Sequence, residues 1–153
     1  MRLFPWQKPK SFFTAEETQA LLEEIRDAER RTSGEVRVFV ERHCRFVDPL
    51  DRAVELFKQL GMDQTADRNA VLVYVAIKDH QLAIFGDEGI HKKVGSEFWN
   101  VELQKMISEF NRNHYAEGIK KVVSDIGEAL CTHFPYNSGT DKNELPDDIV
   151  FGR

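Results

Sequence analysis

One segment decides what this chain can fold into: from Ala70 to Ile77 every residue is apolar, and valine and isoleucine alternate with other residues. A continuous apolar run of this length is typical of a strand that is covered on both faces. Gln81 to Phe85 follows after the short connection Lys78–His80 and predicts an antiparallel hairpin. We therefore expect a mixed sheet whose central strand is residues 70–77.

Helical and alternating spacing predicts the elements around these strands. Thr14 and Glu17 have the form of a capping box at the start of a helix. Apolar residues recur at helical spacing in the segments 15–32, 49–60, 99–110 and 115–130. Helices that alternate with strands in this way predict an α/β fold, a three-layer α/β/α sandwich with a mixed central sheet.

Residues 35–41 alternate between valine and charged or aromatic residues. This pattern predicts a half-exposed strand, with the valines inside and Glu35, Arg37 and Glu41 outside. Pairing of this strand with a second copy would give a dimer, although its charges argue mildly against that.

Length and composition fit one domain. The chain has 153 residues, and 41% of them are hydrophobic, which is enough for a real core. We expect an N-terminal extension at 1–13, a domain at 14–135 and a polar C-terminal tail at 136–153. We favour docking of the tail's apolar tip, Ile149 and Phe151, on the domain over an undocked end.

Charge and cysteine usage exclude several classes of function. Lys and Arg total 21 against 26 Asp and Glu, so the formal charge is −5 and nucleic-acid binding is not expected. No apolar stretch approaches the ~20 residues that span a bilayer, and the first residues lack a signal-peptide pattern. Cys44 and Cys131 are far apart in sequence. We expect no membrane insertion, a reducing compartment and a cytoplasmic location.

Common catalytic motifs are missing from the sequence. It contains no GxxxxGK[ST], GxGxxG, GxSxG or HExxH pattern. His43-Cys44 is a near miss for a cysteine phosphatase, but Leu50 stands where that chemistry needs an arginine, and Arg52 comes two residues too late. We therefore interpret Cys44 as an ordinary residue of a loop.

Polar residues gather where the predicted strands begin or end. If residues 49–60 cross over between parallel strands, one end of the sheet collects several hard oxygen ligands. These metal-ligand candidates are Glu35, Asp67, Asn69, Asp87 and Glu88, with Arg68 as the cation among them. The alternative is a set of solvated turn residues in which Arg68 pairs with a carboxylate. A more scattered polar group is expected at the opposite end, namely Glu41, His43, Asp51, Asp79 and His80.

The chain resembles the TPM domain family, which includes thylakoid acid-phosphatase-like proteins and small bacterial proteins. The resemblance spans about residues 14–134 as an ordered series rather than one motif. Its elements are the opening helix, Thr32–Val38, Ala53–Gly61, Arg68–Ala76, Ala83–Ile90, Phe110 and Tyr115–Ile119.

The resemblance implies an α/β/α sandwich, often with bound Ca²⁺ or another divalent cation. Some members are credited with phosphatase or nucleotide-hydrolysing activity, and others act as binding or assembly modules. Two hypotheses follow. In the first, favoured one, the chain is a binding module that holds Ca²⁺ or Mg²⁺ and meets a protein partner. In the second it is a metal-dependent phosphatase or nucleotide phosphohydrolase acting on a phosphate-containing small molecule, with Arg68 steadying charge and Asp87 orienting water.

Overall fold

The computed structural model describes residues 12–136 and 149–152. In this part of the chain the elements follow one another as α1 (Ala15–Arg30), β1 (Glu35–Glu41), α2 (Pro49–Gln59), the 3-10 turn η3 (Met62–Gln64), β2 (Ala70–Ala76), β3 (Gln81–Gly86), α3 (Glu88–Val94), α4 (Ser96–Asn111), α5 (Tyr115–His133) and β4 (Ile149–Phe151).

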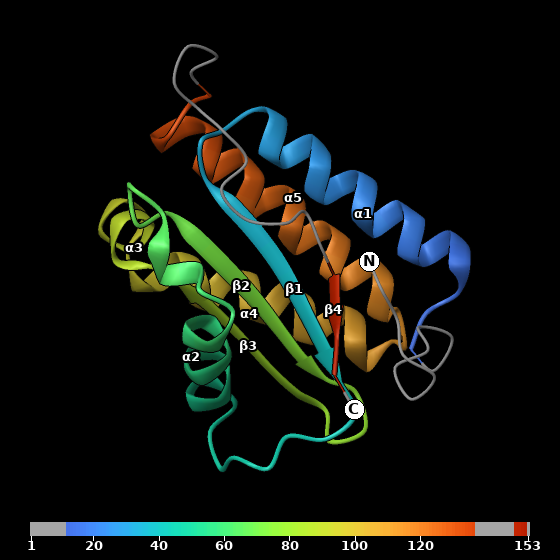
Figure 1. Cartoon of the computed structure of the whole chain (residues 1–153). Helices are drawn as coiled ribbons and strands as arrows, with labels where there is room; N and C mark the ends of the chain where they lie inside the picture. The colour runs from blue at the N-terminus through green and yellow to red at the C-terminus, as the bar shows by residue number, and fades with distance from the viewer. Residues whose placement is uncertain (1–11, 137–148, 153) are drawn as a thin grey trace.

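The strands form a mixed sheet in the order β3-β2-β1-β4 (Figure 1). β1 is parallel to β2 and to β4, whereas β2 and β3 form the predicted antiparallel hairpin. Glu35 pairs in register with Ala70, so β1 and β2 begin at the same end of the sheet, as predicted. The connection that carries α2 is therefore a crossover between parallel strands.

The helices cover the two faces of this sheet unequally. α2 packs on one face, over a core that contains Phe57, Leu72 and Tyr74. α1, α4 and α5 cover the other face, where Ile25, Val73 and Ile126 belong to a larger core (Figure 1). The three-layer α/β/α sandwich with a mixed sheet is thereby confirmed.

The expectation that β1 is half-exposed is wrong. All its residues are buried, including Glu35, Arg37 and Glu41, which are 2%, 5% and 6% exposed. The reason is that β1 lies inside the sheet, with β2 on one side and β4 on the other. Since the edges of the sheet are β3 and β4, the idea of a dimer built by edge pairing of residues 35–41 is also wrong.

Local chemistry explains where the helices begin. The capping box is present at α1, where the Thr14 hydroxyl accepts from the Glu17 N–H and the Glu17 carboxylate accepts from the Thr14 N–H. Asp48 caps α2, and Pro49 occupies its first turn. α3 was not predicted, because Asp87-Glu88-Gly89 has the composition of a turn. Gly95, at φ 80°, separates α3 from α4.

The C-terminal strand β4 ties the two ends of the described chain together. Ile149 and Phe151 are buried, and β4 pairs with Val38 to Val40 of β1. The Phe151 ring stacks on Phe12, with the ring centroids 5.6 Å apart.

None of the described helices is long and apolar enough to cross a membrane.

A buried carboxyl group lies between α4 and α5. Glu102 is 3% exposed, and its side chain contacts Lys105 and Asp125. Burial, together with the neighbouring Asp125 carboxylate, raises the pKa of Glu102 from its ordinary value of 4.5 to about 7. The folded protein therefore keeps a proton on Glu102 over a pH range in which the unfolded chain has released it.

Stability should fall as pH rises from about 4.5 to 7, because the folded state binds more protons there than the unfolded state. Glu102→Gln removes this titration while keeping the shape of the protonated side chain. We expect the variant to gain at least about 1 kcal/mol over wild type at pH 8 and little at pH 4.5. Urea unfolding at both pH values measures the difference. Glu128→Gln, at an exposed position of α5, is the control; an equal gain in both variants would contradict the assignment.

Candidate functional site

The predicted acidic end of the sheet is assembled by backbone hydrogen bonds. The Asp87 N–H donates to the Ala70 carbonyl over 2.9 Å, which brings the end of β3 to the start of β2. The Glu35 N–H donates to the Asn69 carbonyl over 3.4 Å and brings in the start of β1. The sheet topology thus collects the residues that the sequence predicted to lie at this end.

Asp87 and Arg68 form the centre of this end. Arg68 Nε lies 2.7 Å from Asp87 Oδ2, and Arg68 Nη2 lies 2.9 Å from Oδ1. Asp87 also caps α3, since Oδ1 accepts from the Glu88 N–H over 2.8 Å. The Asp87 side chain is buried, whereas that of Arg68 is 44% exposed. The hydrogen bonds to Asp87 and its charge raise the pKa of Arg68.

The backbone around this pair is tightly packed. Arg68 has a left-handed conformation, with φ 51°, and its carbonyl accepts from the Gly89 N–H over 2.8 Å. A Cβ on Gly89 would lie 2.0 Å from the Asp67 carbonyl oxygen. Only glycine allows the loop before β2 to touch the first turn of α3 in this way.

The remaining predicted ligands differ in their exposure. Asp67 and Glu88 are exposed, and Glu88 Oε1 lies 3.6 Å from Arg68 Nη1. Glu35 and Asn69 are buried. Asn69 Nδ2 donates to Ser33 Oγ over 3.2 Å, while Asn69 Oδ1 accepts no hydrogen bond from the described residues. Asn69 therefore presents a buried oxygen that lacks a donor.

These residues fit a cation only in part. Both oxygens of Asp87 accept a hydrogen bond from Arg68, so the guanidinium group competes with a cation for this carboxylate. As the side chains stand, no described group of three or more His, Cys, Asp and Glu residues is arranged to hold a metal ion. The pairing of Arg68 with a carboxylate, which the sequence left open as the alternative, is the arrangement found.

The opposite end of the sheet holds a buried charge network. Glu41 accepts from Arg52 Nε and Nη2, each over 3.0 Å, and from the Tyr74 hydroxyl. Burial and the hydrogen bond to Glu41 raise the pKa of Tyr74, and the Glu41 hydrogen bonds raise that of Arg52. The sequence pointed to Glu41 but missed its partners. A tyrosine inside an apolar strand was the signal, because a buried hydroxyl needs a hydrogen-bond partner.

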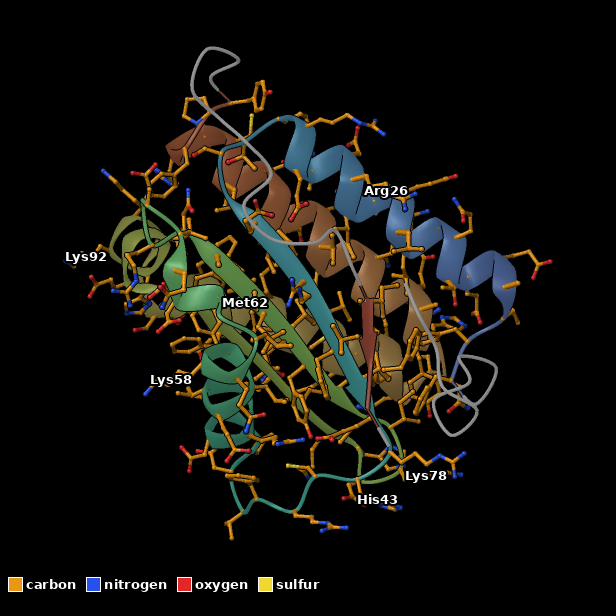
Figure 2. All side chains as sticks on the ribbon, in the orientation of Figure 1. Arg26, His43, Lys58, Met62, Lys78 and Lys92 are labelled. Atoms are coloured by element: carbon orange, nitrogen blue, oxygen red, sulfur yellow. The ribbon has the colours of Figure 1, made fainter. Side chains whose placement is uncertain are left out.

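His43 and Asp79 form a second pair near this network. Figure 2 shows His43 beside Lys78, at the end of the sheet away from Lys92 of α3. His43 Nδ1 is 3.0 Å from Asp79 Oδ1, and the Cys44 N–H donates to Oδ2 over 2.7 Å. These hydrogen bonds lower the pKa of Asp79. A cavity of about 360 Å³ opens here, with Glu41, His43 and Arg52 in its wall. Because Arg52 donates to Glu41 and Glu55, its guanidinium group is committed to the protein itself.

The model of the TPM domain family matches residues 7–129. The chain belongs to this family. Its TPM fold is shared by the solved structure of the BA42 protein from the psychrophilic bacterium Bizionia argentinensis, which is 39% identical, with a TM-score of 0.85 and with 95% of this chain and 99% of BA42 covered.

A more distant structure extends the comparison of this TPM domain. The N-terminal domain of the cg2496 protein from Corynebacterium glutamicum is 12% identical and has a TM-score of 0.57, with 78% of this chain and 75% of that chain covered. At this identity the likeness shows the fold alone. A search of curated proteins gave no match.

The geometry at Asp87 predicts that its substitution costs more stability than substitution of the neighbouring acid Asp67. Asp87→Ala removes the α3 cap and leaves the Glu88 N–H without its acceptor, so we expect a loss of about 1–3 kcal/mol of unfolding free energy. Asp67→Ala, at an exposed position in the same loop region, should change it by less than about 0.5 kcal/mol. Urea titration followed by circular dichroism measures both. Equal losses would show that Asp87 does not hold α3 in place.

Proposed function

We propose that this TPM domain binds a divalent cation, Ca²⁺ or Mg²⁺, at the acidic end of its sheet and acts as a binding module. The observation that carries the proposal is the local excess of acid around one exposed guanidinium group. Asp87 and Glu88 pair with Arg68, and Asp63 adds a further negative charge close enough to raise the Arg68 pKa. Carboxylate oxygens are the ligands that these hard cations prefer.

Asp87, Glu88 and Asp67 are the residues that would hold the ion. Glu88 and Asp67 are exposed, and Asp87 becomes more available once Arg68 leaves it. The half-exposed Arg68 side chain can move into water without being stranded in an apolar environment, so its pairing with Asp87 is exchangeable. The buried Asn69 Oδ1, which lacks a donor in the described structure, is a further oxygen at the same end.

If a cation replaces Arg68 beside Asp87, substitutions of these two residues should change the affinity for the cation in opposite directions. Arg68→Met removes the competitor and should tighten Ca²⁺ binding, whereas Asp87→Asn should weaken it by at least about tenfold. Calorimetric titration of Ca²⁺ and Mg²⁺ measures both variants, and Asp27→Asn on α1 is the remote control. A saturating ion should also stabilise the fold, by about 2.7 kcal/mol at 100 times its Kd. Unchanged affinity in Arg68→Met would contradict the exchange, and no binding by wild type would contradict the site.

The second candidate is a metal-dependent phosphohydrolase at the same place. Its support is the position of Arg68, since a guanidinium group released from Asp87 would stand beside the ion, free to pair with a phosphate. When bound, a divalent cation would supply charge neutralisation on the phosphoryl oxygens.

Phosphate release from ATP and from p-nitrophenyl phosphate separates the two candidates. The binding module predicts Ca²⁺ or Mg²⁺ affinity without turnover. The hydrolase predicts turnover that chelation abolishes and that both Asp87→Asn and Arg68→Met reduce by at least about a hundredfold. Turnover that survives both substitutions would place the chemistry elsewhere.

A further inference from the structure

The outer edge of β3 carries backbone groups that point away from the sheet. Hydrogen bonds alternate in direction along β2 and its flanking residues. The Ile77 N–H donates to the Glu41 carbonyl, and the Asn69 carbonyl accepts from the Glu35 N–H, so both of these residues bond the β1 side. The Ala70 carbonyl instead accepts from the Asp87 N–H, which follows β3. Odd residues of β2 thus face β1 and even residues face β3. In the antiparallel register with β2, Ala83 and Phe85 turn their N–H and C=O groups inward, while Leu82, Ile84 and Gly86 turn theirs outward.

This edge lacks the devices that normally prevent strand addition. Natural edge strands carry charges, prolines or bulges, or are very short. β3 spans Gln81–Gly86 with none of those residue types, and it pairs with β2 one to one without a bulge. No described residue bonds the outward backbone groups of Leu82, Ile84 or Gly86. The edge is therefore open to an added strand.

The open edge forms the floor of a groove of about 700 Å³. The start of α2, at Pro49 and Leu50, forms one wall, and Trp99 and Leu103 of α4 form the other. α2 and α4 cover opposite faces of the sheet, and Figure 1 shows β3 at its edge. Because the lining residues come from these three elements, the groove runs along the edge itself. Its volume lies within the range of about 300–1,000 Å³ that is usual for ligand sites.

One wall is fixed close to the strand. Trp99 ring atoms lie 2.3 Å from where a Cβ of Gly86 would be, so the ring rests against the strand only because Gly86 has no side chain. The Trp99 Nε1–H donates to His91 Nδ1 over 3.0 Å and orients the ring. The groove is thus preformed at this end.

The walls and the charges decide the occupant. In a second copy of this chain, β3 is also flanked by α2 and α4. The walls of the two copies would therefore keep their β3 edges apart, whereas a single extended segment can enter the groove. Exposed acids lie at the two ends of the groove, Asp48 near the start of α2 and Glu88 near the end of β3. At the second end Arg68 also lines the groove, but it faces two carboxylates, Asp87 and Glu88, so acid remains in excess there. Over about 17 Å of strand, the groove therefore matches an extended segment that is apolar at its centre and basic at its ends.

We infer that the edge of β3 binds an extended segment of a partner protein, which adds to the sheet as a further strand. The segment pairs its backbone with Leu82, Ile84 and Gly86 and places apolar side chains against Leu50 on one wall and Leu103 on the other. This inference rests on the edge and its walls, and not on a bound ion; the groove ends at Arg68, Asp87 and Glu88 of the proposed cation site, so its test is carried out without divalent cations.

A peptide of about nine residues, in which valine alternates with threonine and each end is lysine, is the probe. Added at up to about 1 mM to the full chain in EDTA, it should shift the amide NMR signals of β3 and slow hydrogen exchange at Leu82, Ile84 and Gly86. The same peptide N-methylated along its backbone should not. Leu50→Lys should weaken binding by at least about tenfold. Val47→Lys, at a fully exposed apolar residue outside the groove, should leave it unchanged.

Several results would overturn the inference. No response of β3 at the highest peptide concentration would show that the edge does not accept a strand. Equal binding of the N-methylated peptide would show that backbone pairing is not involved, and equal loss in Leu50→Lys and Val47→Lys would place the peptide elsewhere. A dimer in sedimentation velocity that the peptide dissociates would assign the edge to a second copy of this chain. Because EDTA is present throughout, failure here leaves the cation proposal to its own titration.

Discussion

Alternation of the backbone hydrogen bonds along β2 determines the rest of this structure. Buried N–H and C=O groups have to be paired, and β2 pairs with β1 on one side and β3 on the other. The parallel register with β1 places Glu35 beside Ala70, and the antiparallel register with β3 returns the chain to that same end. The contact between Arg68 and Asp87 follows from this register, and so does the outward-facing edge of β3.

Burial of charge inside the sheet is the second constraint. Glu41 can lie within β1 because Arg52 of α2 and Tyr74 of β2 satisfy its oxygens. Losing one member of such a group leaves an uncompensated buried charge, and the network links α2 to β1 and β2 through Arg52. The carboxyl end of the parallel strands is thus committed to structure, and the open chemistry lies at the acidic end and along β3.

Much of the fold could be predicted because its signals are local. The apolar run beginning at Ala70 indicated the central strand, and Thr14 with Glu17 indicated the start of α1. The exposure of β1 was mispredicted, because alternation of charge does not show that α2 and β4 will cover a strand. β4 lies about a hundred residues after β1 in the sequence, and no local pattern predicts that these two strands pair.

The acidic end was predicted in position but not in geometry. Topology alone brought Glu35, Asn69 and Asp87 to one end, whereas the two-point contact of Arg68 with Asp87 depends on the left-handed backbone of Arg68 and the close approach of Gly89. Neither can be read from residue type. The groove along β3 was missed for the same reason, since it arises from two helices that pack on opposite faces of the sheet.

Hydrogen exchange of the β3 amides, followed by NMR on the unliganded chain, tests the hydrogen-bond pattern most directly. We predict alternation, with slow exchange at Ala83 and Phe85, which donate to β2, and fast exchange at Leu82, Ile84 and Gly86, which face outward. Equally slow exchange at both sets would show that the outer edge of β3 is already paired, and it would contradict the open edge.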